Sequence, residues 1–131
     1  MATTNAPSTA TSAVAHELVD LCRARRNAEA IDKFYSDKIV SIESMGNETM
    51  PKEMHGIDAI RAKNQWWNEN MEVHAASVVG PFIGDDAFAV RYSFETTLKA
   101  TGKRSIMKEM ALYTVADGKI VKEEFFDPTG E

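Results

Sequence analysis

Several features are scarce in this sequence, and each scarcity excludes a class of protein. Cys22 is the single cysteine, so no disulfide can form within the chain. No apolar run approaches the length that a transmembrane helix needs. Basic residues number 15 against 20 acidic ones, and their densest group, Arg23 to Arg26, is explained by a helix end, whose dipole favours cations. The sequence therefore predicts binding to neither nucleic acid nor a membrane.

The N-terminal segment also lacks the features of a targeting signal. Residues 1–12 are rich in Ala, Ser and Thr, without the basic start and apolar stretch of a secretory signal. They predict a flexible lead, followed by a single domain over residues 13–131, because 14.5 kDa supports one core. The expected location is the cytoplasm. Three scattered histidines form no zinc pattern, so we expect neither a metal nor a cofactor.

The first half of the chain has helical patterns. Apolar residues repeat at helical spacing on one face of each predicted helix, and Ser12, Asn27 and Asp58 are the predicted caps. The predicted helices cover residues 13–26, a short segment from Asn27, and residues 58–68. A short strand over residues 39–44 and a loop over residues 45–56 separate the last two helices.

The second half has strand patterns. Phe88, Val90, Tyr92 and Phe94 alternate with small or polar residues at a period of two, and Asp117-Gly118 is a strong hairpin signal. Further strands are predicted over residues 72–79, 105–116 and 119–127. Three helices followed by an antiparallel meander predict an α+β fold, in which long strands curl around the helices and leave a conical cavity.

Three short strings in this order resemble a known family: Phe34-Tyr35-Ser36-Asp37, His55-Gly56-Ile57-Asp58-Ala59-Ile60 and Asp117-Gly118-Lys119-Ile120-Val121. They are similar to the SnoaL-like polyketide cyclase and ketosteroid isomerase branch of the nuclear-transport-factor-two-like (NTF2-like) superfamily, from about residue 14 to residue 127. The resemblance implies a cone-shaped, curved antiparallel sheet wrapped on three N-terminal helices, and a homodimer formed through the sheets. It does not fix a function, because this fold hosts isomerases, cyclases, dehydratases, hydrolases and binding modules.

The resemblance to ketosteroid isomerase implies three catalytic positions. That enzyme uses a carboxylate base with a tyrosine and a protonated aspartate that donate to the enolate oxygen. The base position falls on Glu43. The tyrosine position falls on Val19 and the aspartate position falls near Ala111, so both oxyanion donors are missing.

Strand alternation supplies further candidates. Met107, Glu109, Ala111, Tyr113 and Val115 share one strand face, and Val121, Glu123, Phe125 and Asp127 share another. The resemblance directs both faces toward the cavity. Three glutamates around one apolar space cannot all stay ionised cheaply, so at least one pKa should rise, and we expect that of Glu43 above its ordinary value of about 4.3. The predicted catalytic residues are Glu43, His74 and Glu109, and the predicted substrate-binding residues are Lys63, Trp67, Tyr113, Glu123 and Phe125.

Several alternatives stay open from the sequence. Lys63 either lies in solvent or neutralises a pocket glutamate, and pairing with Glu43 would count against Glu43 as a base. Adjacent helix positions diverge, so Trp67 is expected at the cavity and Trp66 against the helices. The leading function is proton transfer on a hydrophobic small molecule, and the rival is a binding module without catalysis. A carrier or assembly role is third.

Overall fold

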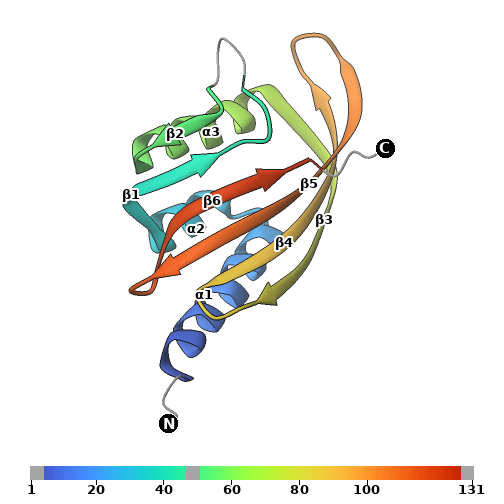
Figure 1. Ribbon diagram of the computed structural model, residues 1–131. Helices are drawn as coiled ribbons and strands as arrows, with labels where there is room; N and C mark the ends of the chain where they lie inside the picture. Colours follow the sequence, from blue (N-terminus) through green and yellow to red (C-terminus); the bar gives the residue numbers. More distant parts are fainter. Residues whose placement is uncertain (1–4, 47–50, 128–131) are drawn as a thin grey trace.

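The computed structural model describes residues 5–46 and 51–127, in which three helices lie on one side of a six-stranded curved sheet (Figure 1). In chain order the elements are α1 (Asn5–Arg23), α2 (Asn27–Phe34), β1 (Tyr35–Ile42), β2 (Glu53–His55), α3 (Ile57–Asn70), β3 (Met71–Ile83), β4 (Ala87–Leu98), β5 (Lys103–Ala116) and β6 (Lys119–Phe126). The predicted α+β class is confirmed.

The sheet has the strand order β2-β1-β6-β5-β4-β3. Strands β3 to β6 form the predicted antiparallel meander, while β1 pairs with β6 in parallel. The expectation of a wholly antiparallel sheet is therefore wrong at this one pair. The cause is topological, because β1 leaves α2 before the meander begins and the last strand returns beside it in the same direction.

One hairpin turn and one register shift determine how the long strands run. At the β5–β6 hairpin both Asp117 (φ 53°) and Gly118 (φ 75°) are left-handed, as a type I′ turn requires. The strand predicted to end at Gly80-Pro81 instead continues to Ile83. Its register shifts between Val79 and Phe82, which accommodates the missing N–H of the proline without ending the strand.

None of the three predicted caps is the cap residue of its helix: α2 begins at Asn27 itself and its cap is Arg26. Helix α1 begins at Asn5, so residues 5–12, which were assigned to the flexible lead, are helical and Ser12 is not a cap. Part of the reason is long-range: Thr11 is buried and its hydroxyl donates to the Asp85 carbonyl, 2.9 Å away. Helix α3 begins at Ile57 behind Gly56, one residue before the predicted cap, Asp58. Residues 1–4 of the lead lie outside the described residues.

The core lies between the helices and the concave face of the sheet. Phe88, Val90 and Tyr92 of β4 are buried there against Leu18 and Val19 of α1. The alternation of buried and more exposed residues that the sequence predicts along β4 is therefore confirmed for these three residues. In the described part of the chain, none of the helices has both the length and the apolar character to cross a bilayer. The cytoplasmic location stays a prediction.

Candidate functional site

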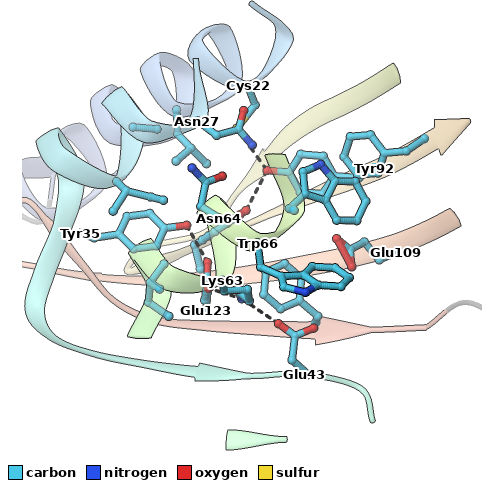
Figure 2. Close-up of a pocket in the computed structure, with 18 of the residues that line it drawn as sticks. Cys22, Asn27, Tyr35, Glu43, Lys63, Asn64, Trp66, Tyr92, Glu109 and Glu123 are labelled. Carbon is cyan, nitrogen blue, oxygen red and sulfur yellow. Dashed lines mark hydrogen bonds and ion pairs between the residues drawn. The ribbon is translucent and has the colours of Figure 1, made fainter. Parts of the chain in front are cut away.

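The concave face of the sheet and the helices above it enclose a cavity of about 340 Å³ (Figure 2). Most of its wall is apolar, with side chains from α1, α2, α3 and the middle strands. Its polar groups include a cluster around Lys63, the carboxyl of Glu109 and a pair of tyrosine hydroxyls. Together they decide which chemistry the cavity allows.

Lys63 of α3 connects two glutamates that lie far apart in the sequence. Its Nζ donates to Glu43 Oε2 at 2.7 Å, to Glu123 Oε2 at 3.2 Å and to Ser41 Oγ at 3.2 Å. Glu123 is only 2% exposed, and its carboxylate also accepts hydrogen bonds from the hydroxyls of Tyr35 (2.6 Å) and Ser41 (2.7 Å). Glu123 is thus a buried carboxylate whose two oxygens are both bonded.

The charge of Lys63 is maintained by its neighbours. Burial on its own would lower the pKa of Lys63, but the charges of Glu123 and Glu43 and their hydrogen bonds raise it above its ordinary value. The ammonium also lies 4.8 Å from the centre of the Phe125 ring, which adds a cation–π contact. All three N–H groups of this ammonium are directed at the cluster, so Lys63 acts as its positive centre.

Glu109 of β5 is a pocket carboxyl with a raised pKa. Its pKa is raised from 4.5 to about 7, first by burial and then by the negative charge of Glu43. Lys63 opposes this rise, while Glu123 and Asp127 add to it. The sequence predicted that at least one pocket carboxyl has a raised pKa, and Glu109 is such a carboxyl, which at neutral pH exists in both protonation states. The same expectation for Glu43 stays a prediction.

This shift predicts how stability depends on pH. The folded protein holds the Glu109 proton up to about pH 7, whereas the unfolded chain releases it near 4.5. The stability that this proton contributes is therefore fully present below pH 4.5 and is lost as the pH rises from 4.5 to about 7, by up to about 3 kcal/mol. Glu109→Gln should remove this loss, so that the variant gains stability relative to the parent between pH 4.5 and 8.5 in urea unfolding. Parallel stability–pH curves for the two proteins would contradict the shift.

A pair of tyrosines supplies two further polar groups. The hydroxyls of Tyr92 and Tyr113 lie 2.7 Å apart, and Cys22 Sγ lies 3.7 Å from the Tyr92 oxygen. Burial holds the pKa of both tyrosines well above the ordinary value, so both keep their protons. One of the two protons makes the bond between them. The other is left to donate to Cys22 or to a bound molecule.

Both tryptophans border the cavity. Trp67 packs edge-on against Phe94, with ring centres 5.7 Å apart, as its predicted place at the cavity requires. Trp66 was expected to pack against the helices instead, and this is wrong: it lies on the cavity wall and is 43% exposed. The divergence of adjacent helix positions does not separate them, since the cavity surrounds more than one face of α3 at its C-terminal end.

Comparison with known proteins decides the family. The family model described as SnoaL-like domain matches residues 9–127. This chain belongs to the SnoaL-like family. Among functionally curated proteins, none matches the sequence.

Solved structures agree with this assignment. A candidate SnoaL-like polyketide cyclase from Mesorhizobium loti is 43% identical, with a TM-score of 0.82 over 88% of this chain and 97% of that one. A second candidate SnoaL-like polyketide cyclase, from Jannaschia sp. CCS1, is 16% identical, with a TM-score of 0.72 over 94% and 88% of the two chains. An NTF2-like protein from Burkholderia pseudomallei is 13% identical, with a TM-score of 0.73 over 90% of each chain, and shares the fold.

Most of the predicted site residues meet in the SnoaL-like cavity. The lining includes Glu43, Lys63, Trp67, Glu109, Tyr113, Glu123 and Phe125. His74 does not belong to it: this histidine is exposed on β3 and its Nε2 lies 2.7 Å from Thr97 Oγ1. The strand around His74 does not alternate cleanly, so the sequence held no signal for its orientation, and its catalytic assignment is abandoned.

Three polar residues of the SnoaL-like site were not identified from the sequence. Tyr92 was predicted only as a residue of an alternating strand, and neither Tyr35 nor Ser41 was predicted to take part in a site. Alternation did direct Tyr92 inward, but nothing local indicated that its hydroxyl meets that of Tyr113 across the β4 and β5 strands. In the described ranges, 5–46 and 51–127, no three side chains of His, Cys, Asp or Glu are grouped to hold a metal ion.

Proposed function

We propose that this SnoaL-like chain is an enzyme that transfers a proton on a mostly apolar small molecule, in an isomerisation, cyclisation or dehydration. One observation carries the proposal: Glu109, with a pKa of about 7, lies on the wall of an apolar cavity. A carboxyl whose pKa is close to the working pH can both accept and return a proton. The 43% identical Mesorhizobium loti protein, named as a candidate polyketide cyclase, supports the same class of chemistry.

The proposed steps use the Glu109 carboxyl and the Tyr92–Tyr113 pair. Ionised Glu109 takes a proton from a carbon next to a substrate carbonyl, and negative charge develops on the carbonyl oxygen. The tyrosine hydroxyl whose proton is not used in the Tyr92–Tyr113 bond donates a hydrogen bond to that oxygen. Protonated Glu109 then returns its proton to a different atom of the substrate, which completes an isomerisation or follows a ring closure. In this proposal the two tyrosines replace the oxyanion donors that are missing at Val19 and Ala111.

Glu43, the base predicted from the resemblance, has a different part in this proposal. Its Oε2 accepts from Lys63 at 2.7 Å, the pairing that counts against a base. Glu43 instead adds negative charge near Glu109 and so raises the proton affinity of the latter. The role of Glu43 as the base stays an untested alternative.

A binding module without catalysis is the second candidate. It is favoured by the missing donors at Val19 and Ala111, both of which are buried apolar residues. The two candidates differ in one measurable respect, since a binding module holds its ligand without exchanging any carbon-bound proton of it.

Proton exchange in heavy water separates the two candidates. The parent protein is incubated in D₂O with a panel of apolar cyclic and aryl ketones, and NMR records both binding and deuterium uptake next to the carbonyl. Uptake faster than in buffer is expected for at least one bound ketone. Binding across the panel without any catalysed uptake would support the binding module and contradict the enzyme.

We also propose a homodimer formed through the outer face of the sheet. Met110 and Leu112 of β5 and Phe126 of β6 are exposed there, Phe126 to 47%, and Phe126 is the register partner of Met110. Apolar side chains on a sheet face are typical of an interface between copies. Arg91, the register partner of Met110 on β4, lies on the same face.

Assembly can be tested with one added charge. The parent should have the mass of a dimer in light scattering at micromolar concentration, and Leu112→Lys should shift it toward the monomer because a buried ammonium would face its own copy. Ala100→Lys, at the exposed β4–β5 turn, adds the same charge away from this face and should leave the mass unchanged. A monomeric parent, or a dimer that tolerates Leu112→Lys, would exclude this interface.

A further inference from the structure

A second cavity, of about 360 Å³, adjoins the first beside the turn between α1 and α2. Its polar side is formed by Arg25, Arg26, Asn27 and Asn68, and its apolar side includes Val73. Five residues border both cavities and form a common wall: Cys22, Asn27, Trp67, Tyr92 and Phe94. Because the two cavities meet at these shared residues, a ligand longer than the first cavity would extend toward the second.

The two cavities carry opposite charge. The charged residues lining the first are Glu43, Glu109, Glu123 and Lys63, so negative groups predominate. The second is lined by two arginines and Glu29. Because Glu29 forms a two-pronged ion pair with Arg26, at 2.6 and 2.7 Å, the remaining positive charge is that of Arg25.

Arg25 is held in position by the end of α1. Arg25 N–H donates to the Cys22 carbonyl at 3.0 Å and Arg26 N–H donates to the Leu21 carbonyl at 2.8 Å, the two bonds of a Schellman motif. In this motif Arg25 is left-handed, with φ 60°. Glycine is the usual residue there, since a side chain costs about 1–2 kcal/mol in that conformation. The chain thus places an arginine where the backbone favours glycine.

The side chain of Arg25 is available to a ligand. It is exposed, and its Nη1 donates to the Val73 carbonyl at 3.3 Å, a bond that keeps it over the cavity. Among the residues that the structure describes, Arg25 forms no ion pair with a carboxylate, whereas Arg26 and Arg61 do. A planar guanidinium without a protein anion matches a carboxylate group well.

We infer that the second cavity binds the carboxylate end of an amphiphilic ligand whose apolar body fills the first cavity. This inference rests on the proposed function and names the class of its substrate: an apolar molecule with one terminal carboxylate. The glutamates of the first cavity repel the carboxylate, and Arg25 attracts it. The charge difference thus fixes which end of the ligand faces Glu109.

The test compares two series of probes by calorimetry: ω-phenylalkanoates of increasing chain length and the matching ω-phenylalkanols. In the parent, the carboxylate should bind about twofold to fivefold more tightly than its alcohol once the chain bridges the two cavities, as for an exposed ion pair. Arg25→Gly should remove this preference and leave the affinity for the alcohols unchanged. Its melting temperature should be at or above that of the parent, because glycine suits the backbone.

Control variants make each outcome decisive. Arg104→Ala removes an exposed arginine outside both cavities and should keep the preference; Arg25→Asn, which also tolerates the left-handed conformation, replaces Arg25→Gly if the latter does not fold. The inference is overturned if alcohols and carboxylates bind the parent equally at every length, or if the preference survives the loss of Arg25. If neither series binds, the apolar cavity of the proposed function fails together with it.

Discussion

Replacing Glu109 by glutamine should lower the rate of proton exchange on a bound ketone by about 10²–10⁴-fold, the usual contribution of a positioned acid or base. Glutamine keeps the shape of the side chain but cannot accept a proton from carbon. Binding of the ketone should change little, since most of the cavity wall is apolar. The measurement is the deuterium uptake described above, made on parent and variant at pH 7 with saturating ketone.

Glu43→Gln is the matched control, because it removes a carboxylate from the same cavity. If Glu109 is the group that carries the proton, Glu43→Gln should only lower the pKa of Glu109, because it removes a nearby negative charge. The exchange rate should then fall much less than for Glu109→Gln. The opposite ranking, a large loss for Glu43→Gln and a small loss for Glu109→Gln, would establish Glu43 as the base that the resemblance implies and would refute the assignment made here.

Lys63→Met should destabilise the folded protein by about 3–5 kcal/mol at pH 7. The substitution keeps much of the volume and removes the ammonium that bonds Glu43, Glu123 and Ser41. Glu123, at 2% exposure, would remain as a buried carboxylate without a cation. The effect should appear in urea unfolding as a large fall in the midpoint at an unchanged slope.

Two further variants test the cause of this loss. Lys33→Met breaks an ion pair with Glu17 in which both side chains are about half exposed, and should cost less than about 1 kcal/mol. Adding Glu123→Gln to Lys63→Met removes the unpaired charge and should restore much of the stability. A Lys63→Met protein as stable as the Lys33→Met protein would show that the cluster contributes little to folding.

Local signals in the sequence were sufficient for most of the fold. The hairpin at Asp117-Gly118 and the alternation along β4 depend on residues next to one another, and both are observed. The parallel pairing of β1 with β6 joins Ser41 to Glu123, and the helical residues before Ser12 are held in part by a bond from Thr11 to Asp85. Such long-range contacts leave no periodic pattern, so the sequence could not indicate them.

The same distinction applies to the site. Alternation grouped Glu109 with Tyr113 on β5 and placed Glu123 on one face of β6, and the resemblance directed both faces toward the cavity that these residues line. Alternation could not indicate which carboxyl would form an ion pair with Lys63, because Lys63 and Glu43 meet only through the packing of α3 on the sheet. That pairing moves the proton-carrying role in our proposal from Glu43 to Glu109. The prediction that His74 faces the cavity had no such support, since its strand lacks a regular alternation.

The most direct test of this account is a titration of the Glu109 carboxyl by ¹³C NMR, with Glu109→Gln used to assign the signal. No substrate is needed. The account predicts a midpoint near pH 7, well above the ordinary 4.5, because the carboxyl is buried beside Glu43. A midpoint at or below 4.5 would mean that Glu109 is permanently ionised at neutral pH, and would contradict its role as the group that accepts and returns the proton.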